Sequence, residues 1–332
     1  MGFSQRLFRK HEFYLVLTIA ILSVIIGLIN NAFFTVGNLF SLIRSCIVTG
    51  IFALGVHMVI VSGDIDVSFM AIATFSMYVT GRFLINNPQY ADNLFLAFAM
   101  SAVIGMCLGA LNAWFISTFK LPTFVVTLGT QNVYRGFLLA FIGTRLITTL
   151  PKCMLDLSRS NLVSVRQGRI LYSLPNTIWF LVVLTIITWL IMRYTKLGRG
   201  IYAIGGDPVA AERVGFNIAR IRLFMYTYVG FLAGIAGIIH ASMIRIGNPF
   251  DLVGQELNVI AAVILGGTKI TGGEGSVLGT LLGVFLLTMI TNSLILMGIS
   301  SYWQRVAIGL ILIASIAVTT YRERRGVTKA YA

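Results

Sequence analysis

The chain has 332 residues, of which 57% are hydrophobic and 11% charged, and its formal net charge is +14. Ordinary soluble domains carry roughly 25% charged residues, so a water-soluble globular protein of this length is excluded because too few charges remain to cover its surface. The apolar residues form long charge-free runs instead. Since a helix of about 20 apolar residues crosses a hydrocarbon core of ~30 Å, we predict an all-α integral membrane protein.

Ten runs are predicted as transmembrane helices. They are 13–31, 45–63, 67–86, 93–119, 122–143, 176–194, 223–244, 257–268, 275–297 and 302–321. The run at 257–268 is the shortest, and the count falls to nine if it does not cross.

Three basic clusters, at 6–10, 193–222 and 322–325, predict the orientation. The net charge invites a nucleic-acid interpretation, but cytoplasmic loops of membrane proteins are enriched in Lys and Arg near helix ends. Six predicted spans separate the first two clusters, and four separate the last two if 257–268 crosses. Even numbers place all three clusters on one side, which predicts ten spans with both termini in the cytoplasm and no nucleic-acid partner.

The segment 144–175 falls on the external side in this arrangement, yet the basic residues of 146–175 outnumber the one acid there, Asp156. The basic residues are Lys152, Arg159, Arg166 and Arg169. A long loop counts little in setting orientation. These side chains are either a solvated surface or a docking surface for an acidic external partner, and both interpretations stay open.

A weak internal repeat joins the fourth and ninth predicted spans. Residues 103–109 and 277–283 both match V-[IL]-G-x-x-L-G. Segments five spans apart run in opposite directions, as an inverted structural repeat requires. The same pattern is a small-residue motif that lets helices approach closely.

Features of catalysis are missing from the sequence. There is no G-x-x-x-x-G-K-[ST] phosphate loop, and the histidines (His11, His57 and His240) have no acid or cysteine at ligand spacing. No nucleophile stands in a pattern that pairs it with a base. We therefore predict a chain that is not an enzyme and holds neither metal nor cofactor.

Few charges lie within the predicted spans, namely Arg82, Arg135 and Arg305. Carriers coupled to protons or ions keep ionisable residues at membrane depth, so the scarcity favours a passive conduit. Asp66, between two runs, is predicted to cap the helix that starts at residue 67 rather than to bind substrate.

A short helix is predicted over 207–215, in the cytoplasmic loop 195–222. Asp207 followed by Pro208 is a strong start, with a capping carboxylate and then a proline at the first helical position. Helix-forming residues follow and a glycine ends them. These are Ala210, Ala211, Glu212, Arg213 and Gly215. Such a helix is not needed to span a membrane, and it is suited to fit a groove in a partner.

Four blocks of sequence carry a resemblance. They are GDIDVS at 63–68, LPTFVVTLGTQNVYRGF at 121–137, GRGIYAIGGDPVAAERVGFNIARIR at 198–222 and ELNVIAAVILGGTKITGGEGSVLGTLLG at 256–283. With these blocks, in this order and spacing, the chain resembles permease subunits of bacterial ATP-binding-cassette importers for monosaccharides, of the ribose and xylose type. That family also includes importers of furanose-like sugars and of furanosyl signalling molecules. The match covers nearly the whole chain.

The resemblance implies a single permease domain over 1–332 in the bacterial inner membrane, with a vitamin-importer-like (type II-like) fold of about ten helices and an inverted pseudo-repeat. It implies a dimer with a second copy or a paralogue around a central pathway. Two cytoplasmic ATPase subunits, or a fused double ATPase, would hold ATP and Mg²⁺ and couple through 207–215. A periplasmic sugar-binding protein would deliver the ligand, with 144–175 as the periplasmic loop.

Sugar-like ligands favour aromatic and amide side chains, so five residues are candidates for the pathway, although such residues more often pack or hydrogen-bond between helices. They are Phe69, Asn112, Gln131, Asn132 and Asn292. Phe69 and Met70 also depart from the small residues that usually follow the D-[IVL]-S motif in that family. The alternative function is a stand-alone secondary transporter or channel for a small polar solute, which would need an ion-coupling site or a selectivity ring.

Overall fold

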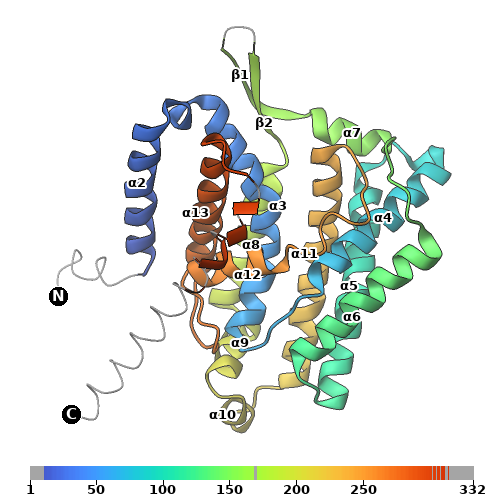
Figure 1. The fold of residues 1–332 in the computed structure, drawn as a ribbon. Helices are drawn as coiled ribbons and strands as arrows, with labels where there is room; N and C mark the ends of the chain where they lie inside the picture. Colours follow the sequence, from blue (N-terminus) through green and yellow to red (C-terminus); the bar gives the residue numbers. More distant parts are fainter. Residues whose placement is uncertain are drawn as a thin grey trace, which may run out of the picture.

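The computed structural model describes residues 11–167 and 170–300, together with 302, 303, 305, 306, 308–310 and 313. Helices dominate it (Figure 1). The longer helices are α2 (His11–Ile29), α3 (Val36–Val61), α4 (Phe69–Asn86), α5 (Leu94–Phe119), α6 (Thr123–Phe137), α8 (Ile178–Tyr194), α11 (Ile218–Ile244) and α13 (Val277–Leu296). The shorter elements are η1 (Asn31–Phe34), η2 (Pro88–Tyr90), η3 (Leu138–Ile142), α7 (Lys152–Arg159), α9 (Lys196–Gly206), α10 (Pro208–Arg213) and α12 (Glu256–Leu265).

The predicted class, a helical membrane protein, is confirmed. Five of the described helices, α2, α3, α5, α11 and α13, are long and apolar enough to cross a membrane. A sixth span is added if α8 and α9, which meet at an angle of 70°, count as one broken span. All five coincide with predicted runs, and α4, α6 and α12 occupy three more.

The predicted crossing at 257–268 corresponds to α12, which has 10 residues. At 1.5 Å per residue it rises about 15 Å, half the thickness of a hydrocarbon core. The last predicted run, 302–321, and the basic clusters at 6–10 and 322–325 lie largely or wholly outside the described residues. The ten-span count and the orientation of the termini therefore stay predictions.

Several long helices begin at polar caps that the sequence supplies. Asn93 accepts a hydrogen bond from Leu96 N at 2.9 Å to start α5, and Asn217 accepts one from Arg220 N at 2.9 Å to start α11. Ser276 does the same for α13, accepting from Gly279 N at 3.0 Å. Side chains at these positions satisfy backbone donors that the first turn leaves free, so the helix starts are set locally.

The centre of the bundle is built by α3 and α11, whose residues are largely buried. In Figure 1, α2 and α13 lie on one side of this centre and α4, α5 and α6 on the other. The two matching heptapeptides mark two tight helix pairs. On α5, Gly105 faces Gly230 of α11 so closely that a Cβ on either would fall on the carbonyl oxygen of the other. On α13, Gly279 faces Gly266, directly after α12, in the same manner.

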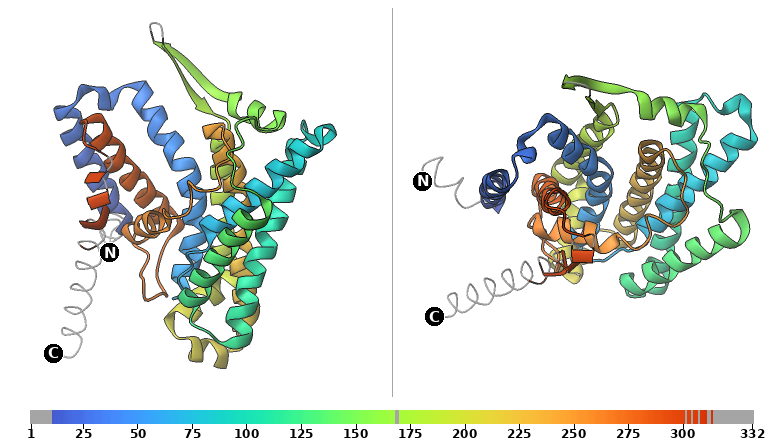
Figure 2. Two further views of the ribbon diagram at one scale, coloured as in Figure 1. Left: turned by 45° about the vertical axis from the view of Figure 1, so that its right-hand side comes forward. Right: turned by 45° about the horizontal axis from the view of Figure 1, so that its top comes forward.

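One region departs from the all-α prediction. Strands β1 (Asn161–Gln167) and β2 (Ile170–Pro175) form an antiparallel hairpin, in which Val165 lies opposite Tyr172. The hairpin projects from the helices at the end opposite α10 (Figure 2). The ring of Tyr172 packs on Gly37, where a Cβ would collide with it, and this contact holds the hairpin against the start of α3. The segment 144–175 is therefore structured, with α7 leading into the hairpin.

Candidate coupling surface and interior polar network

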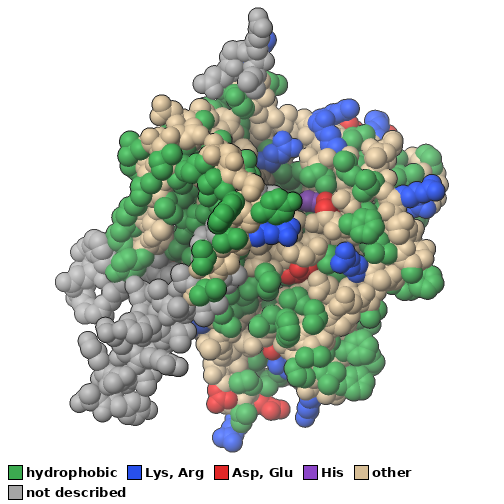
Figure 3. All heavy atoms as spheres, in the orientation of Figure 1, with side chains coloured by type: hydrophobic (Ala, Val, Ile, Leu, Met, Phe, Trp, Pro, Cys, Tyr) green, Lys and Arg blue, Asp and Glu red, His purple; other side chains and the backbone are tan. Residues whose placement is uncertain are grey.

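The short helix predicted over 207–215 is present as α10, while its cytoplasmic location stays a prediction. Asp207 Oδ1 accepts hydrogen bonds from Val209 N at 2.8 Å and Ala210 N at 3.1 Å, and Pro208 occupies the first turn. The helix ends at Arg213, and Gly215 takes a φ of +94°, a left-handed conformation that glycine adopts without strain. A charged tip results, with acidic and basic side chains gathered at the lower end of the molecule (Figure 3).

The tip is not isolated, because α9 supports it. Sequence reasoning missed α9, which Thr195 caps by accepting a hydrogen bond from Gly198 N at 3.0 Å. Ala211 is the buried member of α10, while Val209 and Val214 are 58% and 79% exposed. Val209 and Val214 are therefore exposed next to charged side chains, while the side of α10 that carries Ala211 is buried.

A glycine-rich segment anchors α9 in turn. Gly273 N donates to Val61 O at 2.9 Å, and a Cβ on Gly205 of α9 would collide with that same carbonyl oxygen. Gly272, with a φ of +86°, lies against Gly63. These glycines, which superficially suggest a phosphate-binding loop, allow three backbones to meet at the end of α3.

A hollow of about 970 Å³ opens beside α10. Its walls come from three places in the sequence: 63–65, 117–124 and 212–222. Inside it, Arg222 of α11 and Asp64 form a two-pronged ion pair, with Nε to Oδ2 at 3.1 Å and Nη2 to Oδ1 at 3.2 Å. No local pattern indicates this pairing, since 158 residues separate the partners.

The interior holds a second polar group, centred on Asn112 of α5. Asn112 Nδ2 donates to Ser68 Oγ at 2.7 Å, and Tyr134 OH donates to Asn112 Oδ1 at 2.9 Å. Asp66 Oδ1 accepts from both the backbone N and Oγ of Ser68, each at 2.7 Å. We call Asp66, Ser68, Asn112 and Tyr134 the Asn112 network. It connects α6, α5 and the α3–α4 loop.

The predicted role of Asp66 as a helix cap is wrong. Ser68 occupies the N-cap position of α4, and its side chain makes no capping bond. Asp66 instead closes a turn just before the helix. It is buried, and its second oxygen, Oδ2, has no hydrogen-bond partner among the described residues. A solvated cap would have no such orphaned oxygen.

The other predicted pathway residues are dispersed. Phe69 packs its ring 5.4 Å from that of Phe52 in the core. Gln131 Nε2 of α6 donates to Glu256 Oε1 at 2.7 Å, across to the first residue of α12. Asn132 is exposed and bonds only Leu128 O of its own helix, at 2.8 Å. Asn292 lies on α13, with its Nδ2 buried and unpartnered within the described part of the chain. Asn112 of α5 and Gln131 of α6 thus each form a hydrogen bond to a residue of another element. Asn292 lies apart from them, on α13.

Glu256 was not predicted, although it is 6% exposed and links two halves of the bundle. Both of its oxygens also accept from Gly254 N, each at 3.0 Å. A second acid in the same loop, Asp251, pairs with His240 of α11 at 2.9 Å. Buried carboxylates are stable when hydrogen-bonded in this way. No spacing in the sequence reveals these pairings.

The predicted external basic residues are spread over α7 and the hairpin. Lys152 forms an exposed ion pair with Asp92 at 3.0 Å, and the hydrogen bond to this carboxylate raises the pKa of Lys152. Arg159 lies in the last turn of α7 and Arg166 is exposed on β1. Arg169 lies outside the described residues. One of the three described cations is thus already paired.

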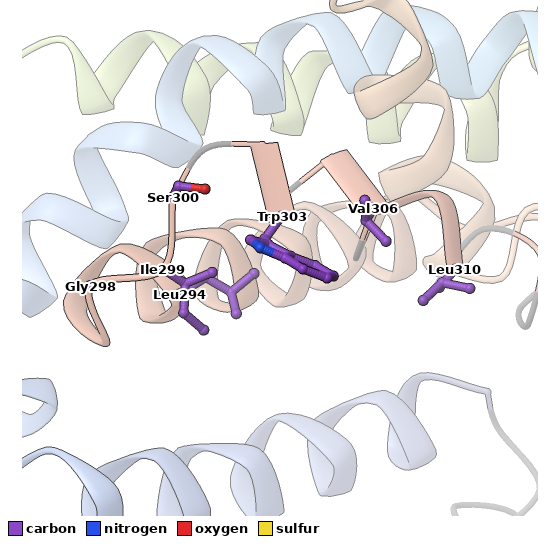
Figure 4. A pocket seen from close by; sticks show the side chains of 7 residues that line it. All are labelled: Leu294, Gly298, Ile299, Ser300, Trp303, Val306 and Leu310. Carbon is purple, nitrogen blue, oxygen red and sulfur yellow. The ribbon is translucent and has the colours of Figure 1, made fainter.

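A hollow of about 630 Å³ near the end of α13 is lined mainly by apolar side chains (Figure 4). Its lining residues are Leu294, Gly298, Ile299, Ser300, Trp303, Val306 and Leu310. Such a lining suits a lipid chain or another helix better than a polyhydroxylated solute. Within the described residues, no group of three or more His, Cys, Asp or Glu side chains could hold a metal ion.

Comparison with known proteins gives a consistent result. Residues 38–316 match the family described as branched-chain amino acid transport system / permease component. The ribose import permease protein RbsC of Haemophilus influenzae is 32% identical over 305 residues, covering 92% of each chain. The probable ABC transporter permease protein YphD of Escherichia coli is 33% identical, covering 95% of this chain and 91% of its own. The autoinducer 2 import system permease protein LsrC of Yersinia enterocolitica is 31% identical, covering 90% and 79%. No solved structure matches.

Proposed function

This chain belongs to the family of branched-chain amino acid transport system permease components, and from that membership we propose that it is the transmembrane subunit of an ATP-driven importer. Its cargo is a monosaccharide or a furanose-like small molecule, since similar proteins are named for ribose and autoinducer 2 import. It works in the bacterial inner membrane. The chain itself hydrolyses nothing, and ATP and Mg²⁺ are held by a separate ATPase.

The observation that carries the coupling to an ATPase is α10. It is a capped helix of 6 residues that packs on α9, and Val209 and Val214 are exposed among charged neighbours. Exposed apolar side chains flanked by charges are typical of a small docking element. Two cytoplasmic ATPase subunits, or one fused double ATPase, bind the chain at 207–215. When ATP closes the ATPase subunits on each other, α10 moves with them.

The proposed fold is the type II-like permease arrangement of ten helices with both termini in the cytoplasm. One feature supports an inverted repeat: the matching heptapeptides both lie at glycine contacts, on α5 against α11 and on α13 against Gly266, directly after α12. A short α12 is compatible with a broken span, because irregular backbone is tolerated at membrane depth where protein or a cavity surrounds it.

A second permease, either a copy or a paralogue, completes the pathway. On α6, a Cβ added to Gly129 or Gly136 would meet no other part of the described chain within 4 Å, and Val125 and Val133 are exposed. Small residues on an open helix face are typical of close helix association in membranes. The candidate pathway residues are Phe69, Asn112, Gln131, Asn132 and Asn292. The periplasmic sugar-binding protein docks on Lys152, Arg159, Arg166 and Arg169.

The decisive experiment measures ATP-dependent uptake of ribose by proteoliposomes that contain the permease, its ATPase and its binding protein. Ala211→Arg places a charged chain beneath α10, where Ala211 is buried, and we expect uptake to fall at least about tenfold with normal membrane yield. Ala32→Arg, at an exposed position in η1 and outside the hollow beside α10, is the matched control and keeps uptake. Unchanged uptake in Ala211→Arg would contradict the coupling role.

The alternative, a stand-alone secondary transporter or channel, predicts a different outcome. Purified permease without any ATPase would then move solute into liposomes under an ion gradient. We expect no such movement, because the described helices α2, α3, α5 and α13 carry few ionisable residues that could couple an ion.

A further inference from the structure

The ion pair between Arg222 and Asp64 joins two parts of the molecule that are far apart in the sequence. Both side chains are largely buried, with 24% and 9% exposed. The geometry is two-pronged, which fixes the orientation of the guanidinium as well as its distance. A planar fork of this kind transmits displacement of one partner to the other better than a single contact would.

Arg222 belongs to the same rigid segment as α10. Phe216 N donates to Ala211 O at 3.1 Å and Gly215 N donates to Glu212 O at 2.9 Å, so the corner after α10 is closed by hydrogen bonds. Asn217 then caps α11, and Arg222 follows within its second turn. A push on α10 therefore reaches the guanidinium through hydrogen-bonded backbone.

Asp64 belongs to the loop that carries the Asn112 network. Its backbone N donates to Val59 O at 3.2 Å, at the end of α3. Two residues later, Asp66 holds Ser68, and Ser68 accepts the hydrogen bond from Asn112. A shift of Asp64 therefore changes the position of the loop that begins α4 and, with it, the contacts to α5 and α6.

Room for such a shift exists beside the pair. The hollow of about 970 Å³ includes Asp64, Ile65 and Arg222 in its walls. The turn between α5 and α6, at 120–124, forms the opposite wall. Beside this open volume the loop is hydrogen-bonded to α6, since Ile65 N donates to Thr123 Oγ1 at 3.4 Å and Thr127 Oγ1 donates to Ile65 O at 3.3 Å, so a shift of the loop is passed on to α6.

We propose that the Arg222–Asp64 ion pair is the link through which movement of α10 reaches the Asn112 network, so that these two residues act as positioning residues for transport. This inference rests on the proposed function, and it adds the route from the coupling helix to the interior. It places the transmitted movement at the α3–α4 loop. The presence of α10 alone would not indicate that the α3–α4 loop is the part that moves.

The test follows the loop directly in the permease–ATPase complex, with the non-hydrolysable analogue AMP-PNP as the probe. A cysteine at Ile65, in a Cys107→Ser background that removes the exposed native thiol, reports the loop through its rate of maleimide labelling. We expect AMP-PNP to change this rate by about fivefold or more. Arg222→Gln should remove the response to AMP-PNP while leaving ATP hydrolysis in place.

Two further variants separate coupling from simple stability. The exchanged pair Asp64→Arg with Arg222→Asp should restore the AMP-PNP response, and Asp64→Asn, which keeps the side-chain shape, should remove it. Asp92→Ala, which removes the acidic partner of an exposed ion pair, is the control and should respond like the parent. A persistent AMP-PNP response in Arg222→Gln or Asp64→Asn would overturn the proposal, as would an unresponsive parent complex that still hydrolyses ATP. Failure of the ATPase to bind the parent permease would overturn the proposed function instead.

Discussion

The pair α5–α11 and the pair α12–α13 use the same contact in different surroundings. Both bring glycine backbones together, and both contain one copy of the V-[IL]-G-x-x-L-G heptapeptide. The first pair joins helices of 26 and 27 residues, while the second joins one of 10 to one of 20. The comparison teaches that one motif can build a long scaffold between helices far apart in the sequence and a short, loop-flanked unit between neighbouring ones.

The largest effect is expected at Gly230, in the long pair. In Gly230→Leu the new side chain meets the backbone of Gly105, which cannot rotate away as a side chain could. Overpacking costs typically about 1–3 kcal/mol, and a backbone collision belongs above that range. We expect loss of most folded protein, measured as membrane yield and thermal unfolding in detergent. Gly206→Leu, at an exposed position where an added Cβ meets nothing within 4 Å, is the matched control.

A smaller effect is expected from Gly283→Leu, in the short pair. Its side chain would meet Ala262 O and the backbone of Gly266. Because α12 is short and ends at Gly266, it can shift at lower cost, and we expect a loss of about 2 kcal/mol in the free energy of unfolding. Equal losses in Gly230→Leu and Gly283→Leu, by the same unfolding measurement, would contradict the contrast between the pairs.

Polar substitutions extend the comparison to the interior. Asn112→Ala, on the long pair, leaves the hydroxyls of Ser68 and Tyr134 without this partner. Tyr134 OH keeps its bond to Leu108 O and Ser68 Oγ keeps its bond to Asp66, so the loss is that of two buried hydrogen bonds, about 0.5–1.5 kcal/mol each, which thermal unfolding should detect. Asn132→Ala removes only an exposed bond within one helix, so its unfolding temperature should stay close to that of the parent.

The smallest effect is expected from Glu256→Gln, at the start of the short helix. The substitution keeps the shape and one acceptor for Gly254 N, but it loses the negative charge at a helix N-terminus. That charge contributes about 0.3–1 kcal/mol, and we expect a loss of about 1 kcal/mol. A loss larger than that of Asn112→Ala would show that the α6–α12 link, not the Asn112 network, dominates the interior.

Local patterns in the sequence were sufficient for the membrane class, for most helix positions and for α10 with its Asp207 cap. They failed where tertiary contacts decide. Glycines at 198, 200, 205 and 206 disfavour a helix by propensity, yet α9 forms there, and at Gly205 the close approach to Val61 O and Gly273 N leaves no room for a side chain. The hairpin was missed because its strands are short and it lies in a loop between spans.

The candidate site shows the same limit. Asn112 and Gln131 were predicted from residue type alone, and both take part in bonds between helices. Their partners were not predicted. Glu256 lies 125 residues from Gln131 and Asp64 lies 158 residues from Arg222, and no local periodicity records pairings across such separations. Asp66 was assigned the wrong local role because a cap and a pre-helical turn use the same residue type.

The glycine contact between α5 and α11 also bears on how the chain is made. Synthesis proceeds from the N-terminus, so α5 leaves the ribosome before α6, the hairpin and α8, and α11 comes only afterwards. Until α11 is made, Gly105 and Gly109 lack the backbone of Gly230 and Tyr226 against which they pack. The scaffold therefore closes late in biogenesis, and a nascent permease that stalls before residue 218 presents an uncovered glycine stripe, a surface that membrane quality control can recognise.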